Sequence, residues 1–216
     1  MSDTPRVTAI ADVLALWGID GALTPPLAPV VAASAPVIGR ARTLQIEPTL
    51  GESRLTDVYD LLSHDLTGAV VVVAGAYSVG GALWGKILST AAAGHHATGA
   101  LVDGGVRDVS VADQLGLPVY ARDVTARGSA LHAHVTGVDD AVAIDGVDII
   151  AGDLIAIDSA GCVRIPQTIE DEVLDAARRY AAAEAEVLRM LGEGLPLTRA
   201  YLAKRTIVNE LRAERG

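Results

Sequence analysis

The sequence predicts an α/β fold, in which strands and helices alternate around one hydrophobic core. Three observations predict it. In the first half of the chain, short apolar runs alternate with stretches whose apolar residues recur at helical spacing. Within this half, the run Ala69–Ala74 is wholly apolar, as expected of a strand that is covered on both faces. After Gly128 the pattern of apolar residues is typical of strands, and from Thr168 onward it is typical of helices.

Length and composition favour a single domain over residues 1–216. Half of the residues are hydrophobic, which is enough to bury one sizeable core, and Phe is absent, so this core must be largely aliphatic. We expect the core over about residues 8–166 and a C-terminal helical extension over about residues 168–214.

The elements of the first half can be predicted in order. Apolar residues recur at helical spacing from Ile10 to Trp17, and Gly18 ends this first helix, which Thr8 can cap. A proline-rich connection then leads to a strand of alternating polarity over residues 37–45. The next elements are a helix from Thr56, a strand over 69–74, a helix over 86–93 stopped by Gly94, a strand over 100–102, a helix capped by Ser110 that runs through Leu115, and a strand over 119–121.

The second half is predicted as a series of strands followed by helices. Before it, Asp103 is expected to shape a turn at Gly104-Gly105, because Asp and Gly favour tight turns. Pro196 is expected to start a last helix. The predicted strands cover residues 130–137, 142–144, 147–150, 154–158 and 162–165, and a long helix covers residues 168–191.

Charge and composition narrow the partners and the compartment. The net charge of −10 provides no basic surface for phosphate binding, which disfavours nucleic acid as a partner. The uncharged stretch from Gly68 to Gly85 is broken by glycines and polar residues, so we expect no membrane span. The N-terminal residues lack the pattern of an export signal, and the single Cys162 gives no sign of an oxidising compartment, so a cytoplasmic location is expected.

One group of residues is suited to binding a small anion. Gly85-Lys86-Ile87-Leu88 begins a predicted helix, whose first amides and partial positive charge can hold a carboxylate. Arg107 can add a bidentate contact to a carboxylate or to an enolate oxygen. The adjacent Asp108 is a suitable ligand for a hard cation such as Mg²⁺. By itself, Arg107-Asp108 would be read as a surface turn.

The surrounding blocks resemble a known family. The blocks Ala82–Leu88, Gly99–Asp108, Leu117–Ala121 and Gly146–Pro166 resemble the 4-hydroxy-4-methyl-2-oxoglutarate aldolases and the regulator of ribonuclease E activity A, over roughly residues 8–190. The resemblance implies a swivelling-domain α/β/α sandwich of the RraA-like type, with flanking C-terminal helices. It also implies a homotrimer or a hexamer with sites between protomers.

The resemblance implies a lyase that cleaves a C–C bond of a small 2-oxo dicarboxylic acid through a pyruvate enolate. The reaction would be retro-aldol cleavage of the 4-hydroxy-4-methyl-2-oxoglutarate type or oxaloacetate decarboxylation. It implies that Arg107 and the loop Gly85–Leu88 bind substrate, while Asp108 holds Mg²⁺ or Mn²⁺ with Glu184 from a neighbouring protomer. The alternative is a non-catalytic, RraA-like regulator that binds a ribonuclease.

Lys86 departs from the family pattern, because metal-dependent members carry an acidic residue directly after this glycine. An ammonium here would repel a divalent cation. Lys86 could instead replace the cation electrostatically, pair with Asp108, form a Schiff base or point to solvent. The sequence leaves these roles open.

Overall fold

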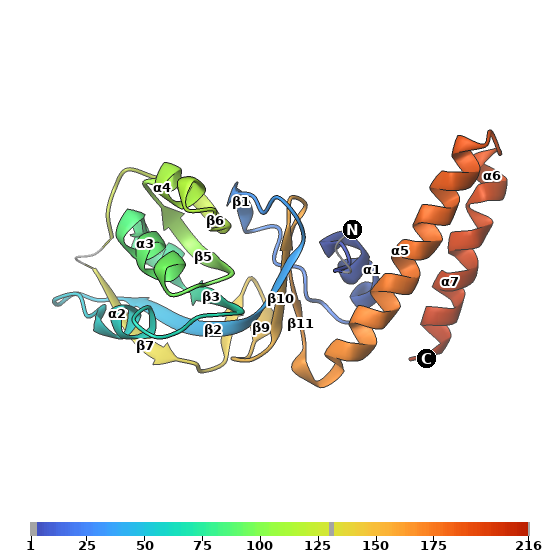
Figure 1. The fold of residues 1–216 in the computed structure, drawn as a ribbon. Helices are drawn as coiled ribbons and strands as arrows, with labels where there is room; N and C mark the ends of the chain where they lie inside the picture. The colour runs from blue at the N-terminus through green and yellow to red at the C-terminus, as the bar shows by residue number, and fades with distance from the viewer. Residues whose placement is uncertain (1–3, 130–131, 216) are drawn as a thin grey trace.

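The computed structural model describes residues 4–129 and 132–215. A mixed sheet with helices on its faces forms the body, and two long C-terminal helices extend from it (Figure 1). Within the described residues, nine strands form the main sheet in the order β1-β6-β5-β3-β2-β10-β11, with β4 beside β5 and β7 beside β2. The strands are β1 (Ala28–Val31), β2 (Val37–Pro48), β3 (Ala69–Ala74), β4 (Ala82–Trp84), β5 (Gly99–Val106), β6 (Val119–Val124), β7 (Ala133–Val138), β10 (Leu154–Asp158) and β11 (Gly161–Ile165), while β8 (Val142–Ile144) and β9 (Val147–Ile149) form a separate pair.

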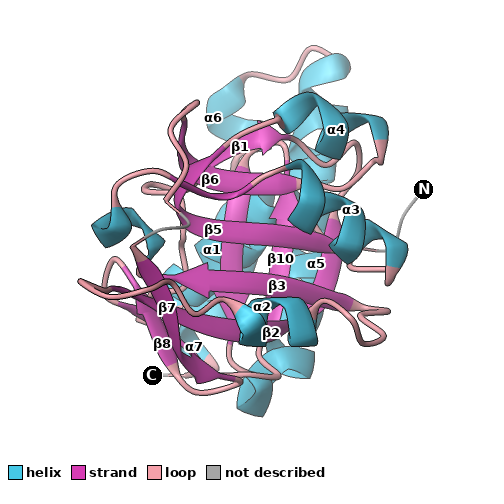
Figure 2. Ribbon diagram, turned by 90° about the vertical axis from the view of Figure 1, so that its left-hand side faces the viewer, coloured by secondary structure: helices cyan, strands magenta, loops and turns pink. Residues whose placement is uncertain are grey.

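The centre of the sheet is parallel and buried on both faces. Strands β2, β3, β5 and β6 pair in parallel, and every residue of β3 and β5 is buried. Three short helices cover one face (Figure 2): α2 (Thr56–Leu61), α3 (Lys86–Gly94) and α4 (Val109–Gln114). On the other face, aliphatic side chains of β3 and β5 pack against the β8–β9 pair and against β10. The result is a nearly closed sheet.

Strand β5 passes through the segment that was predicted to turn. A Cβ atom on Gly104 would lie 2.7 Å from the carbonyl carbon of Ala76, so glycine here permits close packing rather than a bend. The buried carboxylate of Asp103 accepts a hydrogen bond from the Gly75 amide at 3.1 Å and forms an ion pair with Arg122. The expectation that Asp103 shapes a turn is therefore wrong, because a charged partner and a backbone donor satisfy it inside the sheet.

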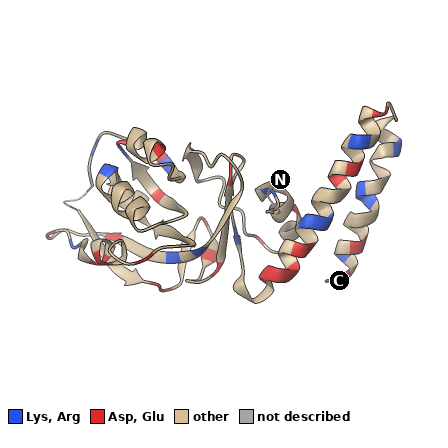
Figure 3. Cartoon of the chain, in the orientation of Figure 1, with Lys and Arg blue, Asp and Glu red and all other residues tan. Residues whose placement is uncertain are grey.

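The C-terminal helices pack on the body through the first helix. Apolar side chains of α1 (Val7–Leu16) lie between β10–β11 and the helices α5 (Glu170–Gly192) and α7 (Leu202–Ala213). A short α6 (Leu197–Ala200) joins the two long helices. Charged residues are spread along α5 and α7 (Figure 3), and the ion pair between Lys204 and Glu184, at 2.6 Å, joins the two helices. Among the described helices, none is long and apolar enough to cross a bilayer.

Most predicted elements are confirmed within a few residues, and the differences have local causes. Helix α1 starts before Thr8 and α4 starts before Ser110, so neither residue is an N-cap. The strand predicted over residues 130–137 is observed from Ala133, and its residues 130 and 131 lie outside the described residues. Strands β1 and β4 were not predicted, since each is short and flanked by Pro or Gly.

Candidate active site

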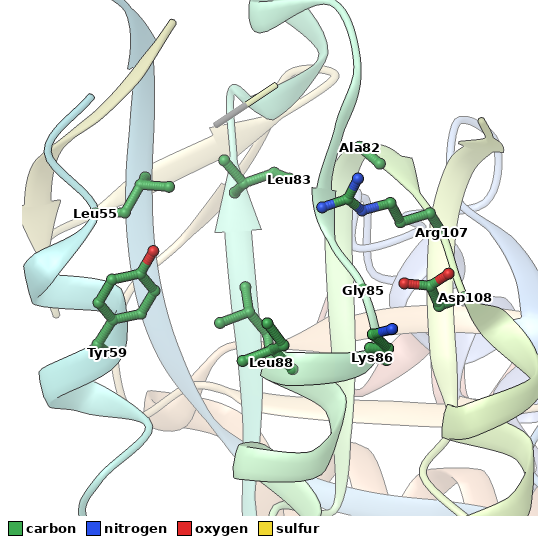
Figure 4. A pocket seen from close by; sticks show the side chains of 10 residues that line it. Leu55, Tyr59, Ala82, Leu83, Gly85, Lys86, Leu88, Arg107 and Asp108 are labelled. Carbon is green, nitrogen blue, oxygen red and sulfur yellow. The ribbon is translucent and has the colours of Figure 1, made fainter. Parts of the chain in front are cut away.

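A pocket of about 130 Å³ lies where the N-terminal ends of α3 and α4 approach α2. Its charged side chains are Lys86, Arg107 and Asp108, which come from the turns that follow β4 and β5 (Figure 4). Because β4 and β5 pair in parallel, the turns at their carboxyl ends meet at one edge of the sheet. The structure thus brings together the residues that the sequence singled out from two separate blocks.

Gly85 is the N-cap of α3 and has an extended backbone that any residue could adopt. Space favours glycine here: a Cβ atom would lie 3.0 Å from Cγ and 3.4 Å from Nε of Arg107, so any other residue would push against this side chain. The amide of Ser89 donates to the Gly85 carbonyl at 2.9 Å, which closes the first turn of α3. The amide N–H groups of Lys86, Ile87 and Leu88, which precede it, have no acceptor within the helix and can donate hydrogen bonds to a bound anion.

Arg107 is held by its backbone and lies against glycine. Its amide donates to the Trp84 carbonyl at 2.9 Å, which fixes the residue beside β4. On the far side of its side chain, a Cβ atom on Gly128 would lie 3.1 Å from Nη1. In the part of the chain that the structure describes, no carboxylate pairs with this exposed guanidinium. It therefore remains able to bind an external anion.

Asp108 has an unusual backbone conformation. It is the N-cap residue of α4, with φ 53° and ψ 36°, and its side chain makes no capping hydrogen bond. Left-handed conformations are uncommon for residues other than glycine, although Asp tolerates them better than most. An N-cap Asp normally uses its carboxylate to accept helix amides. Here the exposed carboxylate lines the pocket instead.

Lys86 lies on the same side of the pocket as Asp108 (Figure 4). Its side chain is exposed, and no ion pair joins it to Asp108 among the residues described. The pairing that the sequence left open is therefore not formed in this structure. The other three roles of Lys86 remain predictions.

The opposite wall of the pocket is apolar, and of its residues only Leu88 was among the predicted site residues. Leu55 and Tyr59 come from the start of α2, Leu83 from β4 and Leu88 from α3 (Figure 4). Leu83 and Leu88 are each only 8% exposed and belong to the core. No sequence motif links Leu55 to Arg107. The two residues line the same pocket from opposite sides only because the fold places the start of α2 across from the end of β5 (Figure 4).

The pocket does not contain a complete metal site within one chain. Asp108 is its one acidic lining residue, and no three His, Cys, Asp or Glu side chains cluster anywhere in residues 4–129 and 132–215. Glu184 lies on α5, on the other side of β10 and β11, and pairs with Lys204 (Figure 1). Mg²⁺ usually keeps several waters and binds one or two carboxylates, and within one chain the pocket offers the single carboxylate of Asp108 together with the ammonium of Lys86.

The sequence is similar to those of known proteins. The profile of the RraA-like family (Aldolase/RraA) matches residues 7–164. A proposed 4-hydroxy-4-methyl-2-oxoglutarate aldolase of Halalkalibacterium halodurans is 28% identical over 168 residues, which are 78% of each chain.

Two solved structures share the fold. An uncharacterized protein from Pseudomonas syringae pv. tomato has a TM-score of 0.78 and 26% identity, over 91% of this chain and 92% of its own. RraAS2 of Streptomyces coelicolor, an unusual member of the RNase ES inhibitor RraA protein family, has a TM-score of 0.69 and 25% identity, over 86% and 90%. The predicted resemblance and the α/β fold with flanking C-terminal helices are confirmed.

Proposed function

We propose that this chain, which belongs to the RraA-like (Aldolase/RraA) family, is a lyase that releases pyruvate enolate from a small 2-oxo acid. One observation carries the proposal: the unpaired guanidinium of Arg107 lies beside the N-terminus of α3, in a pocket that also exposes the Asp108 carboxylate. The candidate substrates are the dicarboxylic acids 4-hydroxy-4-methyl-2-oxoglutarate and oxaloacetate.

The substrate carboxylate would bind the first amides of α3 and the guanidinium of Arg107. When the C–C bond breaks, its electron pair moves toward the 2-oxo group, and an enolate oxygen develops negative charge. Arg107 is a fixed donor that can stabilise this charge, which is the interaction that lowers a barrier most effectively. The same enolate forms in retro-aldol cleavage and in decarboxylation, so one site can support both.

Retro-aldol cleavage also requires that a proton leave the 4-hydroxyl group. The Asp108 carboxylate is available to accept this proton, directly or through water, because it caps no helix amide. Decarboxylation needs no such base. A variant that loses only Asp108 is therefore expected to lose aldolase activity to a greater extent than decarboxylase activity.

Divalent-cation use is a separate part of the proposal. Asp108 would hold Mg²⁺ or Mn²⁺ together with water and with Glu184 of a neighbouring protomer, and the cation would polarise the 2-oxo group. That role of Glu184 requires a trimer or a hexamer, and it requires the Glu184–Lys204 pair to open. Since the donors of one chain do not complete the site, no step of the reaction above depends on a metal.

The test is pyruvate release from 4-hydroxy-4-methyl-2-oxoglutarate and from oxaloacetate, with Mg²⁺, with Mn²⁺ and with a chelator. Arg107→Ala should abolish the activity, whereas Arg199→Ala, an exposed arginine on α6, should leave it unchanged. Absence of pyruvate release from both substrates under all three conditions would contradict the lyase proposal.

The second candidate function is regulation of a ribonuclease. It is favoured by the likeness to the Streptomyces coelicolor protein and by Lys86, which departs from the metal-dependent pattern. It predicts that the purified protein slows RNA cleavage by an RNase E-type enzyme. It also predicts that Arg107→Ala, which destroys the lyase site, leaves this inhibition intact.

A further inference from the structure

We infer that the preferred substrate of the pocket is a 4-hydroxy-2-oxo acid that carries an uncharged, apolar group on C4 in place of a second carboxylate. This inference deepens the proposed function and rests on it. It keeps the lyase reaction on a 2-oxo acid but ranks the two dicarboxylic acids named above below a monocarboxylic substrate, because of what each wall of the pocket can bind.

The charges of the pocket lie on one side. Lys86, Arg107 and Asp108 project from the turns after β4 and β5, whereas Leu55 and Tyr59 face them from α2 (Figure 4). Both cations of the lining are therefore at the end where the 2-oxo acid carboxylate binds. A second carboxylate at the far end would find no cation there among the described lining residues.

The leucines of the apolar wall belong to the core or pack against it, whereas Tyr59 is half exposed. Leu83 and Leu88 are both nearly buried, and Leu55 packs against the same cluster of core residues. These side chains cannot move aside to admit water without exposing core surface. A carboxylate placed against them would lose hydration without gaining a partner, while an alkyl group would be removed from water favourably.

The polar groups described on this wall supply no positive charge. The hydroxyl of Tyr59 can donate one hydrogen bond to a carbonyl, hydroxyl or carboxylate oxygen, but as a neutral group it does not balance the charge of an anion. The start of α2 carries Asp57 in its first turn, and this charge already complements the positive end of the helix. The wall thus accepts an apolar group with at most one neutral polar atom.

The reaction follows from this orientation. With the carboxylate on Arg107 and the α3 amides, C4 and its substituent extend toward Leu55 and Leu83. Loss of the 4-hydroxyl proton forms the carbonyl of an aldehyde, the C3–C4 bond breaks, and its electron pair forms the enolate. Protonation at C3 then gives pyruvate. The products are one aldehyde and one pyruvate, with no change in oxidation state overall.

A matched pair of substrates tests the inference. 4-Hydroxy-5-methyl-2-oxohexanoate has an isopropyl group on C4, and 4-hydroxy-2-oxoglutarate has a carboxylate of similar shape. Both release pyruvate, so one assay measures both. We expect kcat/KM to be at least about 10-fold higher for the isopropyl compound, which is the range for burying two methyl groups rather than an unpaired polar group. An equal or higher value for the dicarboxylate would overturn the inference.

Binding of uncleavable analogues separates this inference from the proposed function. 5-Methyl-2-oxohexanoate and 2-oxoglutarate lack the 4-hydroxyl group, so calorimetry reports their affinity without turnover. Tighter binding of the branched acid with no cleavage of either substrate would refute the lyase function while supporting the selectivity of the pocket. Cleavage combined with tighter binding of 2-oxoglutarate would support the lyase and refute the inference.

A variant can reverse the preference. Leu55→Arg places a guanidinium on the apolar wall and should shift the ratio of kcat/KM values toward 4-hydroxy-2-oxoglutarate by about 10-fold or more. Ile150→Arg, at an exposed position directly after β9, is the matched control and should leave the ratio unchanged. If Leu55→Arg folds with wild-type thermal stability and leaves the ratio unchanged, Leu55 does not contact the substituent and the inference is wrong.

Discussion

The side chain of Arg107 lies against the backbone of Gly128, so closely that a single added methyl group on Gly128 would be 3.1 Å from Nη1. Gly85, at the start of α3, flanks the same side chain, and a methyl group added to Gly85 would lie 3.0 Å from Cγ of Arg107. Two glycines from separate segments therefore leave room for the side chain of Arg107 between their backbones. The position of the charge in the pocket depends on residues that carry no charge themselves.

Gly128→Ala should move the guanidinium and lower kcat/KM by about 10- to 100-fold, because small displacements of a binding group have effects of this size. The backbone of Gly128 lies outside the left-handed region, so alanine should not strain it. Gly94→Ala, where an added Cβ meets nothing within 4 Å, is the control and should retain activity.

The double variant identifies the cause. If Gly128 acts only through Arg107, Gly128→Ala should have no further effect on kcat/KM in an Arg107→Lys background. Additive losses would show that Gly128 acts on the pocket by another route.

Arg107→Lys should lower kcat/KM by about 10²-fold or more. A point ammonium cannot reproduce the planar pair of donors, and loss of one charge-stabilising donor costs a factor of this size. Steady-state kinetics of pyruvate release give the measurement. Unchanged turnover would remove Arg107 from the site.

Lys86 has two roles that substitution can separate. If it repels a metal, Lys86→Asp should create or strengthen dependence on Mg²⁺ or Mn²⁺, because a second carboxylate then lies on the side of Asp108. If it supplies the positive charge itself, the wild type should keep its activity in chelator and Lys86→Ala should lose it.

The opposite pattern would contradict both roles of Lys86. Wild-type activity that disappears in chelator and returns with Mg²⁺, together with an unaffected Lys86→Ala variant, would indicate that the side chain is only solvated.

Cys162 should resist thiol reagents in the native protein. Burial raises the pKa of its thiol from 9.0 to about 12, against a smaller lowering by the Thr24 hydroxyl 3.6 Å from Sγ. The reactive thiolate is then about 10³-fold rarer at pH 8 than in the unfolded chain. Iodoacetamide should modify Cys162 only after unfolding, as followed by mass spectrometry, and rapid native modification would contradict its burial.

The same shift has a consequence for stability. Because the folded-state pKa lies above the unfolded value, the neutral thiol favours the native state fully below pH 9, and this contribution is lost as the pH rises toward 12. Cys162→Ala should reduce the loss of stability over that range, as measured by urea unfolding.

Sedimentation should report a trimer or a multiple of three. The α5–α6–α7 segment exposes large apolar side chains near its tip, including Leu188, Leu197 and Leu202, which a neighbouring protomer could cover. A stable monomer at micromolar concentration would contradict this assembly and also exclude Glu184 from any site between protomers.

How far the sequence predicts the structure depends on how local each signal is. The strands Ala69–Ala74 and Leu154–Asp158 were predicted with their observed bounds, because the first is a fully apolar run, the second is apolar up to Asp158, and short apolar runs between turn residues favour buried strands. Asp103-Gly104-Gly105 was misread, because glycine serves close packing as well as turns. The close approach to Ala76 that requires glycine is set by a distant segment, and no local pattern reveals it.

The same distinction applies to the site. Arg107, Asp108 and the Gly85–Leu88 turn were predicted together and line one pocket, because all belong to blocks of recognisable composition. Leu55, Tyr59 and Leu83 were missed, since no local pattern marks them and they line the pocket only because the fold brings α2 close to β4 and α3.

Helix α1 packs with α5 and α7 although more than 150 residues separate it from them in the sequence. The indole of Trp17, directly after α1, donates to the carbonyl of Leu211, 194 positions later, and apolar residues of α1 pack against α5 and α7. On the ribosome, α1 emerges long before either helix exists, and its apolar face has no lasting partner during translation. The central sheet can collapse before α5 and α7 are made, whereas this second core is completed only once both helices are present.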